Sequence, residues 1–82
     1  PLDKLSQFQS WKPNLEAAIA ADSKNADLRF FRLSVQFSVP ALLEYNSNMM
    51  EDEQKTRAAI ADGHWSGNIE HQTFISSFLD QL

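Results

Sequence analysis

The sequence contains no cysteine and few residues that break regular structure, with two glycines and three prolines among 82 residues. The absence of cysteine excludes disulfide bonds, thiolate metal sites and cysteine nucleophiles, and it fits the cytoplasm and an exported compartment equally well. The scarcity of glycine and proline is typical of a helical globular domain and excludes collagen-like and low-complexity chains. These absences leave a small folded domain without cysteine chemistry.

The sequence also lacks long apolar runs and clusters of basic residues. No apolar segment approaches the length of about 20 residues that a membrane-spanning helix needs. The 7 lysines and arginines are scattered among 11 acidic residues, and the net charge is −4. Because nucleic acids and anionic membranes attract basic patches, we expect neither as a partner.

The length limits the chain to one domain. Residues 1–82 form a single helical domain in this interpretation, and a domain of this size buries only a modest core. The sequence opens on Pro1-Leu-Asp, without a methionine or a signal-like stretch. We therefore expect a fragment of a longer chain, with a surface that contacts a partner.

Apolar residues recur at helical spacing over residues 3–21. Phe8, Trp11, Leu15 and Ile19 lie three or four residues apart, which predicts one face of a helix. Pro13 lies within this stripe, and proline inside a helix removes one backbone hydrogen bond. The sequence predicts either a kink or two helices that meet near Pro13, and the unbroken phase of the stripe favours the kink.

A second helix is predicted over residues 26–38, after a tight polar turn. Asn25 stands where an N-cap residue is expected. The apolar arc of this helix is so wide that we expect a central helix, with Phe31 buried in the core. Pro40 prevents smooth continuation, so residues 41–45 are predicted to form a separate short helical turn.

Arg29, Arg32 and Gln36 form a narrow polar line along the second helix. If that helix is central, the two guanidinium groups must reach solvent or pair with carboxylates, because an unpaired buried charge is costly. We expect structural pairs with Asp22 or Glu44. The alternative is an anion-binding or partner-docking role for the two arginines.

A third helix is predicted over residues 49–62. Asn48 and Glu51 have the spacing of a capping box, and the acidic residues 51–53 oppose the positive end of the helix dipole. Gly63 is a natural helix stop.

A fourth amphipathic helix is predicted after the loop of residues 64–67. Its apolar band is made of the following residues: Phe74, Ile75, Phe78, Leu79 and Leu82. The band indicates one buried face that needs a surface to cover it.

Together these segments predict an all-α fold, a small antiparallel helical bundle. Residues 15–30 (LEAAIAADSKNADLRF) resemble the junction between two tetratricopeptide repeats, which implies a tetratricopeptide-like hairpin. Ser23 stands where such repeats carry proline, and Arg29 and Arg32 stand where they carry large apolar residues. No second copy appears at the repeat period, so a regular repeat array is not expected.

A second resemblance extends over about residues 1–60. Residues 27–36 (DLRFFRLSVQ), residues 39–46 (VPALLEYN), and Asn48 with Glu51 and Asp52 resemble an uncharacterised family of small exported bacterial helical proteins. The resemblance implies an export signal and a further helical segment before Pro1, and hence an exported or periplasmic location. It implies no activity, substrate or catalytic residue.

Reactive side chains form no recognisable constellation. His64 and His71 flank a loop beside Asp62 and Glu70, but their spacing does not point two imidazoles the same way. The serines lack a neighbouring base that would activate them. We therefore predict no catalytic residue, no cofactor and no metal site.

Two hypotheses of function follow. The first is a non-catalytic helical protein-interaction or scaffolding module, because the apolar faces exceed what so short a bundle covers. The alternative is a small ligand-binding or enzymatic domain with a polar pocket near Arg29, Arg32 and Tyr45. A continuous apolar surface favours the first, and a polar pocket that holds both arginines favours the second.

The expected partner is a protein. Arg29, Arg32, Phe78 and Leu82 are the candidate interface residues, and a weak symmetric homodimer through Phe78 and Leu82 is one form of the interaction. The sequence leaves open whether the two tryptophans are core or interface residues.

Overall fold

The computed structural model describes residues 2–39 and 43–82, with side chains described from residue 7 onward. It contains the helices α1 (Leu2–Ala21), α2 (Ala26–Ser38), α3 (Met49–Ala61) and α4 (Ile69–Leu79). No strand occurs within the described residues. The prediction of a small all-α bundle is confirmed.

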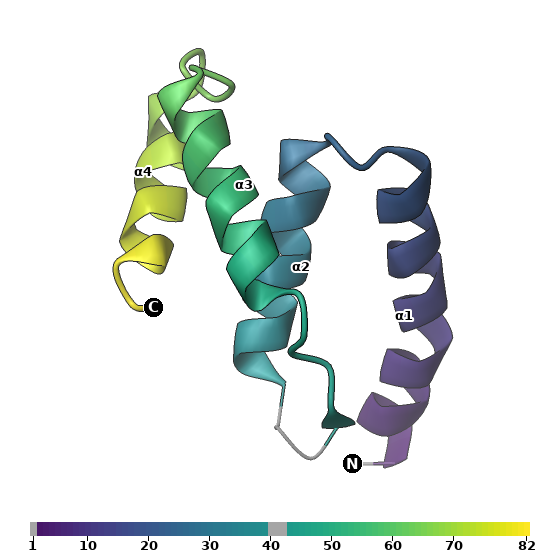
Figure 1. The fold of residues 1–82 in the computed structure, drawn as a ribbon. Coiled ribbons are helices and arrows are strands. Elements are labelled where there is room, and N and C mark those ends of the chain that lie inside the picture. Colours follow the sequence, from purple (N-terminus) through teal and green to yellow (C-terminus); the bar gives the residue numbers. More distant parts are fainter. Residues whose placement is uncertain (1, 40–42) are drawn as a thin grey trace.

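Consecutive helices run antiparallel, and α2 lies in the middle of the arrangement (Figure 1). α1 stands on one side of α2, and α3 and α4 lie on the other side. Within the part of the chain that the structure describes, no helix is long and apolar enough to cross a membrane.

Asparagine side chains begin two of the helices. Asn25 is the N-cap of α2, and its Oδ1 accepts a hydrogen bond from the backbone N–H of Leu28 at 3.1 Å. Asn68 caps α4 in the same way through the backbone N–H of His71, at 3.1 Å. Each cap satisfies one of the backbone donors that a helix N-terminus leaves free. The predicted N-cap at Asn25 is confirmed.

Gly63 ends α3 by adopting the left-handed conformation, with φ of 80°. Its backbone N–H donates to the carbonyl of Ile60 at 3.1 Å, and the N–H of His64 donates to the carbonyl of Ala59 at 3.0 Å. This pair of bonds is a Schellman motif, which favours glycine because a Cβ is disfavoured at positive φ. The predicted stop at Gly63 is confirmed.

α1 continues through Pro13 as one helix, so the alternative of two separate helices is wrong. Pro13 is exposed. Its apolar neighbours Leu15 and Ile19 are buried on one face, as the unbroken stripe predicts.

Two hydrophobic cores lie on opposite sides of α2. The larger core joins α2, α3 and α4 and contains Ala26, Phe30, Leu33, Trp65, Ile75 and Leu79. The smaller core joins α1, α2 and the segment after residue 42, and contains Leu15, Ile19 and Tyr45, with Phe8, Trp11, Leu28, Val35 and Val39 packed against it. Trp65 is therefore a core residue, and Trp11 packs at the edge of the smaller core.

Two local predictions fail between α2 and α3. The side chain of Asn48 does not cap α3, because it pairs with Gln36: Gln36 Nε2 donates to Asn48 Oδ1 at 3.0 Å, and the Asn48 N–H donates to Gln36 Oε1 at 3.1 Å. The predicted short helix at 41–45 lies partly outside the described residues. Residues 43–45 are described, and Glu44 among them has a φ of 54°, which a right-handed helix does not contain.

The expected burial of Phe31 is also wrong, since 52% of this residue is exposed. α2 instead turns Leu33 and the polar line of Arg29, Arg32 and Gln36 inward. The helix can bury these polar side chains because α3 supplies carboxylates opposite them, as described below. The width of the apolar arc alone therefore does not identify which face of α2 is buried.

We expect Leu33→Ala to lower the free energy of unfolding by about 2–5 kcal/mol, because Leu33 has no exposed surface and its loss leaves a cavity. Phe31→Ala should change the same quantity by less than about 1 kcal/mol, because an exposed side chain leaves no cavity. Urea denaturation of the two variants measures both values. Equal losses would place Phe31 in the core.

Candidate functional site

A buried ion cluster joins α1, α2 and α3. Its members are Glu16, Arg29, Arg32, Glu51 and Asp52. Asp52 has no exposed surface, and the two arginines are only 6% and 3% exposed. Because isolated charges are costly to bury, the geometry of this cluster decides whether α2 can sit at the centre of the fold.

Asp52 holds both guanidinium groups. Arg32 donates from Nε to Oδ2 at 2.7 Å and from Nη2 to Oδ1 at 2.9 Å, which is a bidentate pair. Arg29 donates from Nη1 to Oδ1 at 3.1 Å. The hydrogen bonds to Asp52 raise the pKa of Arg32 above its usual range, although burial acts in the opposite direction.

The remaining donors of the arginines reach three other parts of the chain. Arg29 donates to Glu51 at 3.0 Å and, through Nε, to the backbone carbonyl of Ser23 at 2.9 Å. Arg32 donates through Nη1 to Glu16 of α1 at 2.7 Å. The cluster thus connects the α1–α2 turn, α1 and the first turn of α3 through two side chains of α2.

Tyr45 extends the cluster into the smaller core. Its hydroxyl donates a hydrogen bond to Glu16, and the ammonium of Lys12 lies 4.8 Å from the centre of its ring. Burial raises the pKa of the Tyr45 phenol well above its usual range, and the hydrogen bond to Glu16 acts in the same direction. The hydroxyl therefore stays protonated near neutral pH and serves as a donor.

The prediction that the arginines pair with carboxylates is confirmed, but the expected partners are wrong. Asp22 accepts a hydrogen bond from Asn25, and Glu44 is exposed. The partners are Asp52, Glu51 and Glu16, because the face that carries Arg29 and Arg32 turns toward α3. Glu51 and Asp52 belong to the acidic residues at the start of α3, which the sequence analysis explained only by their favourable interaction with the helix dipole.

The polar atoms of the ion cluster are already paired with one another. Among the described residues, every buried side-chain nitrogen and oxygen has a hydrogen-bond partner. Arg32 and Tyr45 are almost completely buried, and both donate hydrogen bonds to Glu16. The geometry supports a structural role for these side chains.

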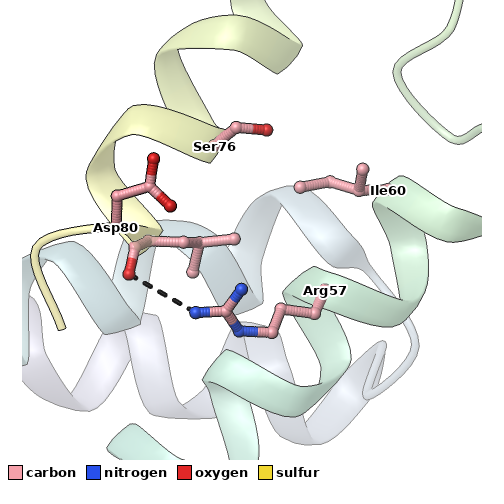
Figure 2. A pocket seen from close by; sticks show the side chains of 5 residues that line it. Arg57, Ile60, Ser76 and Asp80 are labelled. Carbon is pink, nitrogen blue, oxygen red and sulfur yellow. Dashed lines mark hydrogen bonds between the residues drawn. The ribbon is translucent and has the colours of Figure 1, made fainter.

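Two hollows lie on the surface near this region. One has a volume of about 280 Å³ and lies between α3 and α4, lined by Arg57, Ile60, Ser76, Leu79 and Asp80 (Figure 2). Arg57 donates there to the Leu79 carbonyl at 3.4 Å and pairs with Glu53 at 2.9 Å. Figure 2 shows the carboxylate of Asp80 one helical turn after Ser76, and no hydrogen bond joins these two described side chains. Arg57 thus places a cation at the C-terminal end of α4, which is a structural use.

The other hollow, of about 180 Å³, is lined by the residues Lys24, Ala26, Arg29, Lys55, Ala58, Ala59 and Asp62. The guanidinium of Arg29 is already paired with carboxylates, and Asp62 adds a negative charge to the rim. Its lining carries three cationic side chains, Lys24, Arg29 and Lys55, and one carboxylate, Asp62. Neither Arg32 nor Tyr45 lines it, so it is not a pocket that holds both arginines.

Trp65 and the two histidines surround the first turn of α2. Trp65 Nε1 donates to Asp27 Oδ1 at 2.8 Å, and His64 Nε2 lies 3.4 Å from Asp27 Oδ2. The bond from Trp65 lowers the pKa of Asp27 below its ordinary value, and His64 acts in the same direction against the effect of burial. His71 stacks on Phe74 at 6.5 Å between ring centres. In residues 2–39 and 43–82, no group of three acidic or histidine side chains is placed to hold a metal ion.

An aromatic surface runs along α2 and α4 on the side away from the ion cluster. We call Phe30, Phe37, Phe74 and Phe78 the aromatic face. Their rings make edge-to-face contacts: Phe30 lies 6.2 Å from Phe74 and 5.5 Å from Phe78, and Phe37 lies 5.4 Å from Phe78. Phe30 is buried, whereas Phe74 is 61% and Phe37 42% exposed.

The four candidate interface residues therefore fall into three places. Arg29 and Arg32 belong to the ion cluster, and Phe78 is half-buried within the aromatic face. Leu82 follows the end of α4 and is exposed. Sequence reasoning missed Phe37 as a member of the same surface, because nothing in the sequence shows that α2 and α4 lie side by side.

Comparisons with known proteins give no relative: no family model, no curated protein and no solved structure matches this chain.

We expect Asp52→Asn to lower the free energy of unfolding by about 3–5 kcal/mol, because it removes the charge that compensates two buried guanidinium groups. Glu53→Gln is the matched control. Glu53 belongs to the same turn, but its pair with Arg57 lies at the surface, so the loss should be below about 0.5 kcal/mol. Chemical denaturation of the two variants measures the difference, and similar values would exclude a central role for Asp52.

The lowered pKa of Asp27 makes part of the stability depend on pH. A carboxyl group whose pKa is lowered by folding stabilises the fold above its ordinary value of 3.8, and this contribution disappears as the pH falls through the folded value. We therefore expect the stability of the wild type to fall more steeply than that of Asp27→Asn between about pH 5 and pH 2. Urea melts followed by tryptophan fluorescence measure both curves. If the two stabilities fell in parallel with pH, folding would not lower the pKa of Asp27.

Proposed function

We propose that this chain is a non-catalytic helical protein-interaction module whose binding surface is the aromatic face. One observation carries the proposal: Phe37 and Phe74 are substantially exposed, although they lie beside buried core residues of the same helices. Large aromatic side chains supply much of the energy of protein interfaces, and contiguous exposed apolar patches mark interaction sites.

The aromatic face rests on a rigid base. α2 is held to α3 by the buried ion cluster, and α4 is held to α2 by Ile75 and Leu79 in the larger core. The edge-to-face contacts among the rings fix their positions relative to one another. A surface that is already ordered loses little conformational entropy when a partner binds.

The observed geometry gives less support to a small ligand-binding or enzymatic domain. That alternative needs a polar pocket beside Arg29, Arg32 and Tyr45. Their polar groups instead bond to Asp52, Glu51 and Glu16.

The resemblances of the sequence fit an interaction module. Tetratricopeptide proteins use stacked antiparallel helix pairs to present binding surfaces, and α1 and α2 form one antiparallel pair here (Figure 1). We include a tetratricopeptide-like hairpin and membership of the exported bacterial family in the proposal. Detection of the full-length gene product in the periplasmic or secreted fraction would test the exported location.

Nuclear magnetic resonance tests the binding surface. We expect an uncharged amphipathic helical peptide, with leucines on one face and glutamine and serine on the other, to shift the signals of Phe37, Phe74 and Phe78. Phe74→Ala should weaken this binding at least about fivefold, because it removes an exposed anchor, and anchors of this kind contribute more than about 1 kcal/mol.

Ile69→Ala is the matched control for Phe74→Ala. Ile69 is also on α4 and is 65% exposed, and its position five residues before Phe74 places it about 140° away around the helix. Its loss should leave peptide binding unchanged. Equal effects of the two variants, or signal changes spread over the whole chain, would argue against the aromatic face as the binding surface.

A further inference from the structure

The positive charges of the chain are absent from its C-terminal quarter. Arg57 is the last lysine or arginine in the sequence, and the only charged or titratable side chains after it are His64, His71 and the acidic residues Asp62, Glu70 and Asp80. α4 and its C-cap therefore carry two carboxylates, Glu70 and Asp80, and no lysine or arginine. The same helix supplies half of the aromatic face.

Carboxylates also border the aromatic face where the structure describes it. Glu70 precedes Phe74 by one helical turn on α4, and Asp27 precedes Phe30 by nearly one turn on α2. The basic residues nearest to these carboxylates in the sequence lie elsewhere: Arg29 and Arg32 belong to the ion cluster, Lys24 lines the hollow beside α3, and Arg57 contacts the end of α4 from α3. The imidazole of His64 is the group closest to Asp27 that can become positively charged. The apolar surface thus has an acidic border.

The size and charge of this surface disfavour a second copy of the chain as its occupant. Each fully exposed aromatic side chain offers roughly 150–250 Å², so the exposed parts of these rings provide a few hundred Å². A stable interface between folded proteins needs about 800 Å² from each partner. A symmetric dimer would also bring together two acidic borders in a chain whose net charge is −4.

We infer that the aromatic face receives a basic amphipathic helix, with apolar residues on one side and lysine or arginine beside them. This inference rests on the proposed function and adds the chemistry of the partner. Phe37, Phe74 and Phe78 are the members of this face that solvent reaches: Phe74 and Phe78 lie one turn apart on α4, roughly 6 Å along the axis, and Phe37 lies beside Phe78. An apolar stripe with i, i+3, i+4 and i+7 spacing is long enough to cover these rings, and its flanking cations meet Glu70 and Asp27.

Two peptides with the same leucine stripe test the inference, one with lysine and one with glutamate at the remaining positions. Fluorescence anisotropy with the intact chain should show at least about tenfold tighter binding of the lysine peptide at 50 mM salt. The advantage should shrink at 500 mM salt, because surface charges are screened. Glu70→Lys should remove most of the preference.

Asp80→Lys is the matched control for Glu70→Lys. Both variants change the net charge equally on α4, but Asp80 lines the hollow on the α3 side of the helix. Asp80→Lys should therefore leave most of the preference intact. If both variants weakened the preference equally, the net charge alone would explain it, and the inference would be wrong.

Other results would distinguish a failure of this inference from a failure of the proposed function. If both peptides bound with equal affinity and Phe74→Ala weakened both, the aromatic face would still be the binding surface, but a basic partner would be refuted. Dimerisation in analytical ultracentrifugation that Phe74→Ala abolishes would identify a second copy as the occupant and would also refute it. Failure of the lysine peptide and the uncharged peptide to bind would refute both proposals.

Discussion

Asp52 is the carboxylate on which the central position of α2 depends. It has no exposed surface, and it accepts hydrogen bonds from Arg29 and Arg32, so the polar line of α2 can face inward. Without this negative charge, the two guanidinium groups would be buried with little compensation, which is costly. The ion cluster therefore selects which face of α2 is core, and it leaves Phe37 on the opposite side beside α4.

The sequence predicts the helices well because their signals are local. Asn25 and Gly63 mark helix ends through their own backbone chemistry, and the apolar spacing places Leu15 and Ile19 on one buried face. The partners of the arginines could not be found in this way. Arg32 and Asp52 are separated by 20 residues, and their pairing depends on how α3 packs against α2. The same reason hides the contact between Phe37 and Phe78.

The two sides of α2 have different chemical characters. On one side, charged and aromatic groups of α1 and the segment around Tyr45 meet the ion cluster. On the other side, the larger core ends in rings that remain open to solvent. The buried polar side fixes the orientation of the helix, and the apolar side is free to act as a binding surface. This division is the basis of the proposal that the aromatic face binds a protein.

The separation of the two cores also has a dynamic consequence. α1 contributes Leu15 and Ile19 to the smaller core, whereas Leu33 and Ile75 belong to the larger one. Local opening of α1 would break the Arg32–Glu16 pair and uncover that side of the ion cluster, but it would leave the larger core between α2, α3 and α4 buried. Native-state hydrogen exchange would then divide the chain into two cooperative units, with faster exchange in α1. The aromatic face belongs to the unit with slower exchange, so it would stay folded when α1 opens.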